Sequence, residues 1–159
     1  MGNVEDSEST VVKKATATDA PAILELVKEH LKESVYSWLP VSDEKIVDTV
    51  LWFIEQDPKT AYLIVVYDKD ILAGIVACVS IPLTFTESKV SGELLWLVRK
   101  DYRGSFIGKK LLNLLEEWSR LTNHGAIQVG SNDKRTDKLL KHLGYKEKSR
   151  TFIKVIDGN

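Results

Sequence analysis

Hydrophobic residues recur along the chain at two spacings, and each spacing predicts one kind of element. A spacing of three or four residues predicts amphipathic helices, and capping residues mark their ends. The expected helices run from Pro21 to Leu31, from Ser42 to Asp57, from Ile107 toward Gly125, and from Asp133 to Leu143. Runs rich in β-branched and aromatic residues predict strands. The expected strands cover residues 11–15, 61–67, 71–80, 90–98, 126–130, 145–148 and 150–156.

The order of these elements predicts how the chain folds. The strands at 61–67 and 71–80 are separated only by DKD, so an antiparallel hairpin is expected. The run ELLWLV at 93–98 lacks polar alternation, which is typical of a central strand buried on both faces. The order β-α-α-β-β-β-α-β-α-β-β indicates an α/β fold with a central mixed sheet and helices on both of its faces.

Length and composition indicate the number of domains, the classes of partner and the cellular compartment. A chain of 159 residues with 43% hydrophobic content fits a single domain, expected at 11–157 after a disordered polar tail at 1–10. Because the net charge is −1, no nucleic-acid partner is expected. The apolar runs are shorter than the roughly 18 residues of a membrane span, so no membrane partner is expected either. The single Cys78 excludes an internal disulfide and favours a cytoplasmic protein, and no metal motif is present.

The stretch RKDYRGSFIGKKLL at 99–112 carries the most informative chemistry. A strand leads into a turn with Gly104 and Gly108, and the turn opens a helix, so unpaired amides and the positive end of the helix dipole point to one place. Five cationic side chains and one acid give residues 99–110 a charge of +4. The glycine spacing fits neither a nucleoside triphosphate loop nor a dinucleotide loop. Two interpretations remain, an anion-binding site or solvated surface cations.

The segment ELLWLVRKDYRGSFIGKKLLNLLEEW at 93–118 resembles the acyl-coenzyme A binding motif of the GCN5-related N-acetyltransferase (GNAT) superfamily. Arg103 and Gly108 match the motif, and Phe106 stands where its first glycine is usual. The later segment SND…LLKHLGYK also resembles the family, and the chain is similar to small acetyltransferases of bacteria and their phages. The resemblance implies a GNAT-like fold with acetyl-coenzyme A (acetyl-CoA) as co-substrate.

The resemblance also implies where coenzyme A (CoA) binds. The strands at 94–99 and 127–130 would separate, and the backbone of Leu97, Val98 and Arg99 would hold the pantetheine arm between them. Asn132 resembles the family's Asn before the last helix and would contact CoA. The diphosphate would lie on the turn formed by Arg103, Gly104, Ser105, Phe106, Ile107, Gly108 and Lys109.

Candidate catalytic groups follow from the chemistry of acyl transfer. Glu93 is the candidate general base, because apolar neighbours raise the pKa of a carboxylate toward neutrality, and the alternative is a strand-end residue in water. Amides near Leu97 or Val98 are candidates for polarising the thioester carbonyl. The position of the family's usual tyrosine acid falls on Leu140, so no proton donor is assigned to the leaving sulfur. A thiol with a pKa of about 8.5 is a tolerable leaving group without one.

The expected function is transfer of an acetyl group from acetyl-CoA to a primary amine of a small molecule or protein. The unknown amine acceptor would enter near Tyr36, Trp38 and residues 148–150. One alternative is a catalytically impaired acyl-CoA-binding module that acts as a sensor or interaction partner, as Leu140 would suggest. Another is a plain anion- or nucleic-acid-binding domain, which would need a wider basic face. Four Trp and an exposed sheet edge are compatible with a homodimer.

Overall fold

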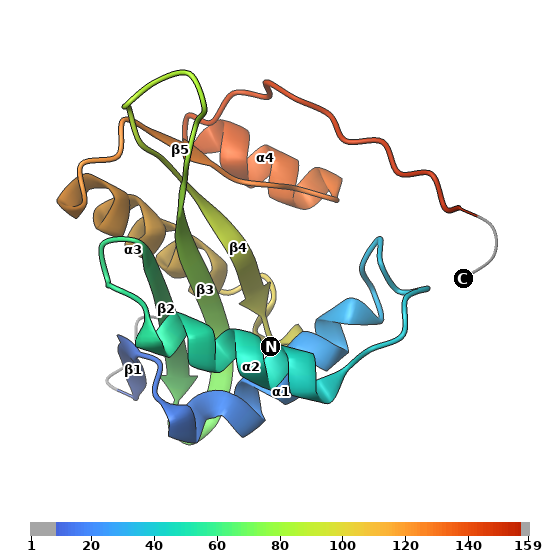
Figure 1. Cartoon of the computed structure of the whole chain (residues 1–159). Coiled ribbons are helices and arrows are strands. Elements are labelled where there is room, and N and C mark those ends of the chain that lie inside the picture. Colours follow the sequence, from blue (N-terminus) through green and yellow to red (C-terminus); the bar gives the residue numbers. More distant parts are fainter. Residues whose placement is uncertain (1–8, 157–159) are drawn as a thin grey trace. The chain divides into compact units, whose positions relative to one another are not determined.

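The computed structural model of the protein describes residues 9–156 (Figure 1). The chain divides into two compact units, with the boundary between Val129 and Gly130. Within the described residues, the first unit holds a sheet and three α-helices, and the second holds one α-helix. Residues 1–8 of the expected tail and residue 157 at the end of the expected domain lie outside this description.

The first unit is built on a mixed five-stranded sheet in the order β1-β2-β3-β4-β5. The strands are β1 (Thr10–Lys14), β2 (Ala61–Asp68), β3 (Ile71–Ile81), β4 (Val90–Val98) and β5 (Ala126–Gln128). The first four pair antiparallel, and β5 runs parallel to β4. β2 and β3 form the expected hairpin, and β4 has the bounds that the sequence predicts.

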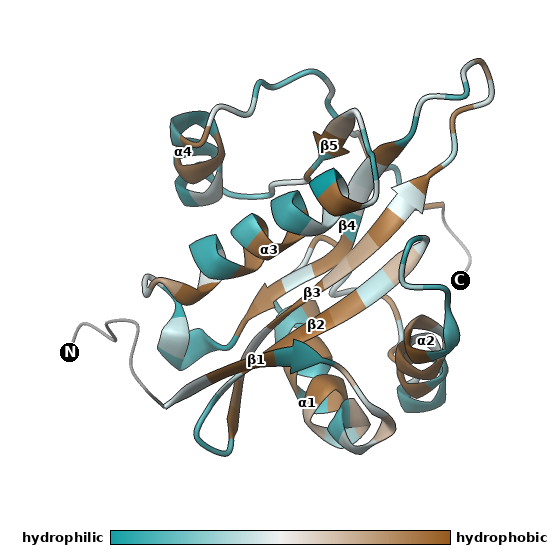
Figure 2. Cartoon of the chain, turned by 90° about the vertical axis from the view of Figure 1, so that its left-hand side faces the viewer, coloured by the Kyte–Doolittle hydropathy of each residue, from teal (hydrophilic) through white to brown (hydrophobic). Residues whose placement is uncertain are grey.

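Helices cover both faces of this sheet, as Figure 2 shows. They are α1 (Ala20–Leu31), α2 (Asp43–Glu55) and α3 (Ile107–Leu121), with short 3-10 helices η1 (Ala17–Asp19) and η2 (Lys100–Tyr102) before α1 and α3. α1 and α2 lie on one face and α3 lies on the other, with its hydrophobic side toward the sheet. The core under α1 and α2 consists of buried apolar side chains, among them Ile23, Leu26, Phe53, Leu63, Val65, Ile75 and Leu97.

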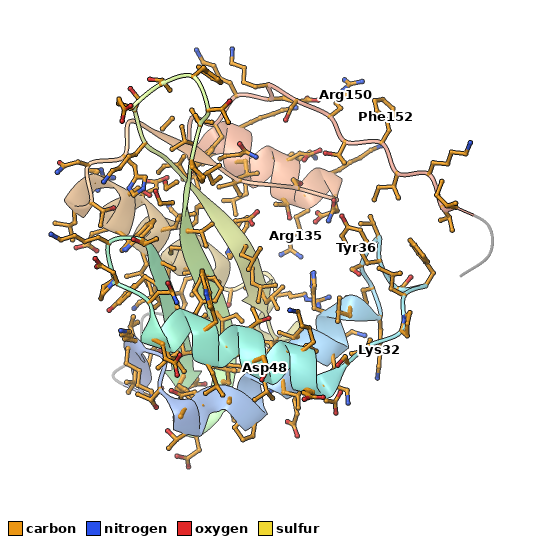
Figure 3. The ribbon with its side chains drawn as sticks, viewed as in Figure 1. Lys32, Tyr36, Asp48, Arg135, Arg150 and Phe152 are labelled. Atoms are coloured by element: carbon orange, nitrogen blue, oxygen red, sulfur yellow. The ribbon has the colours of Figure 1, made fainter. Side chains whose placement is uncertain are left out.

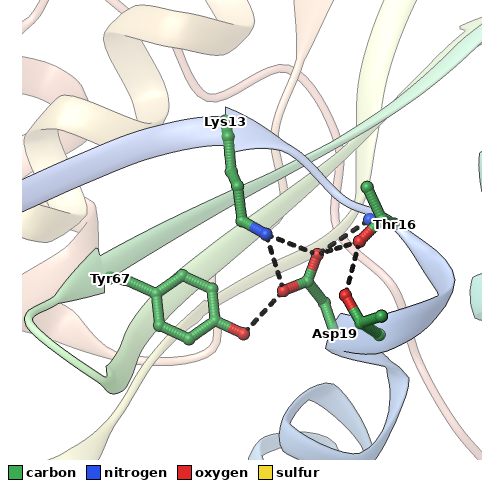
Figure 4. A network of polar contacts seen from close by, with 5 residues as sticks. Lys13, Thr16, Asp19 and Tyr67 are labelled. Atoms are coloured by element: carbon green, nitrogen blue, oxygen red, sulfur yellow. Dashed lines mark hydrogen bonds and ion pairs between the residues drawn. The ribbon is translucent and has the colours of Figure 1, made fainter.

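The path from β1 into α1 is fixed by the buried carboxylate of Asp19 (Figure 4). Its Oδ1 accepts hydrogen bonds from Lys13 Nζ at 3.0 Å and from the Tyr67 hydroxyl at 2.8 Å. Its Oδ2 accepts one from the Thr16 amide at 2.8 Å. Burial raises the pKa of Asp19, but the hydrogen bonds from Thr16, Lys13 and Tyr67 outweigh it, so the pKa lies below its ordinary value. The network joins β1, η1 and β2.

The second unit contains α4 (Lys134–His142), which has a capped start and end. Asp133 Oδ1 accepts hydrogen bonds from the amides of Arg135 and Thr136, both at 2.9 Å. After the helix, Gly144 has φ 91°, a left-handed conformation that favours glycine, and the Tyr145 amide donates to the Leu140 carbonyl at 2.9 Å. The sequence signals for this helix are therefore confirmed.

The prediction of two strands at 145–148 and 150–156 is wrong. Residues 145–156 form no strand, and Phe152 is 91% exposed. Strand formation depends on a neighbouring strand that completes the hydrogen bonds, and alternation of apolar residues cannot supply one. The observed element order ends at α4, while the α/β class, the mixed sheet and the helices on both of its faces agree with the prediction.

Two further details differ from the sequence-based expectation. β4 is not buried on both faces, because Leu94 is 53% exposed. α3 ends at Leu121 and not at Gly125, since Asn123 takes the left-handed conformation first, with φ 59°. None of the described helices has the length and apolar character needed to cross a lipid bilayer.

Candidate active site

Within residues 9–156, β4 has neighbouring strands on both sides only at its beginning. Its first three residues pair with β5, and the last of these pairs is Gly92 with Gln128. From Glu93 to Val98, the described part of the chain places only β3 beside it. This second half of β4 therefore presents an open edge, at the place where the sequence predicts two strands to separate.

The direction of the backbone groups along this edge follows from the pairing with β3. The Arg99 amide donates to the Ala73 carbonyl at 2.8 Å, so Arg99 directs its backbone toward β3. In an antiparallel pair, hydrogen-bonded and non-hydrogen-bonded residues alternate. Leu97 therefore also directs its backbone toward β3, while Trp96 and Val98 direct theirs to the open edge. Of the three residues expected to hold a ligand arm, Val98 is the one that can donate and accept hydrogen bonds there.

The turn after β4 leaves several amides without a partner. The amides of Tyr102, Arg103 and Ser105 donate to carbonyls within η2 and the turn, and the Ile107 amide donates to Ser105 Oγ at 3.3 Å. Within the described residues, four amides of the turn and the first helical turn donate no hydrogen bond: those of Gly104, Phe106, Gly108 and Lys109. Because α3 begins here, these amides also lie at the positive end of its dipole.

The two glycines of the turn have different physical roles. Gly104 has φ 86°, so the chain reversal itself favours glycine. A Cβ at Gly108 would lie 3.6 Å from Val98 Cγ2 and 4.0 Å from the Trp96 ring, which are ordinary contact distances. The protein's own packing therefore does not require glycine at 108. The Trp96 indole holds the start of α3 against β4 by donating to the Gly108 carbonyl at 3.1 Å.

The cations of the turn are partly paired with an acid that the sequence did not indicate. Arg103 Nη1 donates to Glu33 Oε2, and Lys100 Nζ lies 3.9 Å from Glu33 Oε1. The hydrogen bond and the charge of Arg103, together with Lys100, hold the pKa of Glu33 below its ordinary value. Arg103 Nε also donates to the Val98 carbonyl at 3.3 Å, so this side chain joins the turn to the open edge.

Phe106, at the position where the family motif usually has glycine, is half-buried at the start of α3. Lys110 Nζ lies 5.4 Å from the centre of its ring, within the range of a cation–π contact. The Lys109 side chain is exposed. The expected +4 stretch thus has Arg103 bound to Glu33, Lys110 over an aromatic ring, and Lys109 directed to solvent.

Glu93 is the first residue of β4 beyond its pairing with β5. It pairs in register with Cys78 of β3. It also lies two residues after Ser91, whose hydroxyl is 2.6 Å from Ser119 Oγ on α3, so the Glu93 side chain lies on the face of the sheet that α3 covers. Burial, and secondarily the charge of Glu93, raise the pKa of the Cys78 thiol to about 12, so Cys78 is no nucleophile near neutral pH.

A cavity of about 510 Å³ lies on the opposite face, between α1, α2 and the sheet. It is lined mainly by apolar side chains: Ile23, Val27, Leu31, Tyr36, Leu39, Pro40, Val41, Ile46, Val50, Phe53, Leu63, Ala77, Leu94 and Leu95, with Ser42, Lys45 and Thr49. Tyr36 lies on the segment between α1 and α2 (Figure 3). Tyr36 therefore lines this cavity. Trp38 is not part of the lining, and its indole donates to the Val35 carbonyl at 3.1 Å.

Comparison with known proteins identifies the family. The profile of the Acetyltransferase (GNAT) family matches residues 23–145. The chain belongs to the GNAT acetyltransferase family. The matched range includes the open edge of β4 and the turn, so the features predicted from the sequence lie inside the family domain. A search among curated proteins found no significant match.

Solved structures share the GNAT fold at low sequence identity. A Trypanosoma brucei acetyltransferase is 20% identical, with a TM-score of 0.72 over 92% of this chain and 99% of that one. Glucosamine-6-phosphate N-acetyltransferase from Arabidopsis thaliana is 16% identical, with a TM-score of 0.75 over 94% and 100%. AAC(6')-Iy, solved with the bisubstrate analogue CoA-S-monomethyl-acetylneamine, is 13% identical, with a TM-score of 0.72 over 94% and 99%. These likenesses establish the fold of the GNAT domain.

Some residues that the GNAT resemblance points to belong to the second unit. Asn132 is exposed immediately before the Asp133 cap of α4, and residues 148–150 are also exposed. Within that unit Leu140 is buried, and its carbonyl accepts the bond that ends α4. The Leu140 side chain offers no proton donor, and its carbonyl belongs to the cap of α4.

Two features of the GNAT site were not predicted from the sequence. Glu33 is 70 residues from Arg103 in the chain, and no local pattern distinguishes it from other surface acids. The cavity depends on how α1, α2 and three strands pack, although the aromatic segment VYSWLP did point to this region. Contacts across such distances have no signature in residue spacing.

Proposed function

We propose that this GNAT protein transfers an acetyl group from acetyl-CoA to a primary amine and releases CoA. The observation that carries the proposal is that the open edge of β4 leads directly into a cationic turn with four unpaired amides. An extended ligand with a polyanionic end could form hydrogen bonds with the open edge of β4 and place its anionic end on the turn.

The edge suits the pantetheine arm, whose amides can pair with a strand as an added peptide strand does. Val98 supplies the outward amide, and Trp96 supplies the neighbouring outward backbone groups. Leu97 and Arg99 act through their pairing with β3, which holds the edge in place.

The turn suits the diphosphate, because backbone amides at a helix start bind phosphate groups well. The amides of Gly104, Phe106, Gly108 and Lys109 supply the hydrogen bonds, and Lys109 supplies charge. Ser105 and Ile107 shape the turn through the bond between Ser105 Oγ and the Ile107 amide. Arg103 reaches the phosphates if it leaves Glu33, and Asn132 is proposed as a further contact of the carrier.

The chain's own groups then have three tasks in the transfer. When bound, acetyl-CoA supplies an activated acyl group as a thioester. The Val98 amide stabilises negative charge on the carbonyl oxygen as the carbon–nitrogen bond forms and the carbon–sulfur bond breaks. Glu93 accepts the proton that the amine loses, and the sulfur leaves as thiolate. Because Glu93 and the apolar cavity lie on opposite faces, this proton passes through water at the edge.

Calorimetric titration with CoA, followed by thiol release from acetyl-CoA with an amine panel, tests the proposal. The double variant Lys109→Glu/Lys110→Glu should weaken CoA binding at least about tenfold, because charge-assisted contacts to phosphate are lost. Acidic residues in a first helical turn are favourable, so the variant should still fold. Lys59→Glu/Lys89→Glu changes the net charge equally, away from the turn, and should bind CoA normally.

Each outcome of these measurements has a defined meaning. CoA binding with thiol release that depends on an added amine supports the transferase. Equal CoA affinity in both double variants contradicts the placement of the diphosphate. CoA binding without release, whichever amine is added, favours a binding module over an enzyme.

A further inference from the structure

The apolar cavity reaches the point where β4 loses its pairing with β5. Leu94 and Leu95 line the cavity, and both follow within three residues of Gly92, the last residue paired with β5. Under the proposed function, the thioester would lie along this same stretch of the open edge. A molecule in the cavity would therefore have one end beside the reacting carbonyl.

The lining selects for apolar chemistry. Of the described residues that line the cavity, only Lys45 is charged, and none is acidic. The Ser42 hydroxyl accepts a hydrogen bond from the Lys45 amide at 3.2 Å, and the Thr49 hydroxyl donates to the Lys45 carbonyl at 2.8 Å. Both hydroxyls are therefore engaged with the backbone of α2, and the lining offers few polar groups to a ligand.

The surroundings of the cavity are apolar as well. Four large apolar side chains of the lining are exposed to solvent: Tyr36 at 48%, Leu39 at 44%, Val41 at 48% and Leu94 at 53%. Exposed large apolar side chains that gather around a cavity mark a binding site more often than a plain surface. An apolar ligand would cover them on binding.

We infer that the acceptor of the proposed reaction is a primary amine carried on an aliphatic or aromatic body, and that this cavity binds the body. The inference rests on the proposed function and adds the substrate class. A polycationic acceptor would need carboxylates to replace water around its charges, and the lining supplies a lysine instead. An apolar site also favours the neutral amine over the ammonium, and only the neutral amine can attack the thioester.

A series of straight-chain amines from propylamine to octylamine tests the substrate class. The KM for the amine should fall about threefold to fourfold with each added methylene group until the cavity is filled, as expected for apolar burial. Spermidine should be a poorer substrate than hexylamine. Binding of hexylamine without acetyl-CoA, measured by saturation-transfer NMR, gives a readout that does not require turnover.

Two variants of α2 locate the site. Thr49→Phe places a large ring in the cavity lining and should abolish both the chain-length dependence and the NMR signal of hexylamine. Asp48→Phe makes the same change at the adjacent position, which is exposed and outside the lining, and should preserve both (Figure 3). CoA titration and circular dichroism should be unchanged in both variants, which separates loss of the amine site from loss of CoA binding or folding.

The outcomes separate this inference from the function on which it rests. A KM independent of chain length, or spermidine turned over faster than hexylamine, would overturn the apolar acceptor while leaving the transferase in place. Failure to bind CoA would overturn the proposed function. Even then, the NMR signal of hexylamine, and its loss in Thr49→Phe, would decide whether the cavity binds apolar amines. Equal hexylamine binding in Thr49→Phe and Asp48→Phe would refute the placement.

Discussion

Arg103, on the turn before α3, donates a hydrogen bond from Nη1 to the carboxylate of Glu33, just beyond the end of α1. The same guanidinium donates from Nε to the Val98 carbonyl at the open edge. One side chain thus connects α1, the edge of β4 and the turn that is proposed to hold diphosphate. In the protein without a ligand, the Glu33 carboxylate is paired with the Arg103 guanidinium. An anionic ligand would compete with Glu33 for this cation.

Replacing Glu33 with Gln should therefore tighten CoA binding. The amide keeps the size of the side chain but removes the charge that competes for Arg103, so affinity should rise about twofold to fivefold, as for other exposed ion pairs. Calorimetry at low and moderate salt measures the change. Glu29→Gln on α1, outside this ion pair, is the control and should have no effect. Weaker CoA binding in Glu33→Gln would mean that Glu33 positions Arg103 for the ligand.

Gly108→Ala should be tolerated by both the fold and the ligand site. The new Cβ would make only ordinary contacts, at 3.6 Å and 4.0 Å, and alanine favours the helix, so the free energy of unfolding should be unchanged or rise by up to about 1 kcal/mol. CoA affinity should be nearly unchanged, because the methyl group would lie against Val98 and Trp96 of β4 and leave the amides of the turn accessible.

Gly74→Ala is the contrasting variant. Its Cβ would lie 2.8 Å from the Leu97 carbonyl oxygen, a backbone atom, so this change should destabilise the fold. Denaturant unfolding and CoA titration of both variants give the comparison. A Gly108→Ala protein with much weaker CoA binding would show that the ligand approaches the turn at this Cβ position.

Glu93→Gln should lower kcat by about a hundredfold if Glu93 is the general base, since positioned proton acceptors contribute about that much. The dependence of kcat/KM on pH should also lose the limb that reports deprotonation of the base, while CoA affinity stays the same. Glu87→Gln, in the exposed loop before β4, should leave the rate and the profile unchanged. An unaltered pH profile in Glu93→Gln would leave Glu93 as a residue on the α3 face of β4 with no part in proton transfer.

Asp19→Asn should weaken the junction of β1, η1 and β2. The amide loses the ion pair with Lys13 and one or more hydrogen bonds, so the free energy of unfolding should fall by about 1–3 kcal/mol near neutral pH. Because the pKa of Asp19 is lower in the folded protein than in the unfolded chain, its contribution is complete above about pH 5 and is lost as the pH falls through the folded pKa.

Urea unfolding between pH 2 and pH 7 measures this difference. The gap between the natural protein and Asp19→Asn should be constant above about pH 5 and should narrow below about pH 4. Asp48→Asn, an exposed aspartate beyond the first turn of α2, is the control and should show no such gap. A gap that persists at pH 2 would mean that the carboxylate charge of Asp19 contributes little.

The sequence alone determined most of the local structure. The bounds of β4, the hairpin of β2 and β3, the Ser42 cap of α2 and the glycine turn before α3 depend on residues close together in the chain. Periodicity and capping are properties of such neighbours, so they can be read without knowing the fold. The GNAT resemblance rests on the same kind of contiguous stretch, and the family match agrees with it.

The tertiary structure decided everything that depends on distant partners. Residue patterns did not show that Arg103 pairs with Glu33, or that α1, α2 and the sheet enclose a cavity. The GNAT resemblance implied that β4 and β5 separate, and only the structure shows that, within the described residues, their pairing ends at Gly92. The same reason explains the two strands predicted after α4, because residues 145–156 alternate like a strand but pair with none. Hydrogen bonds between strands and contacts between elements are made only after the chain has folded, and residue spacing does not encode them.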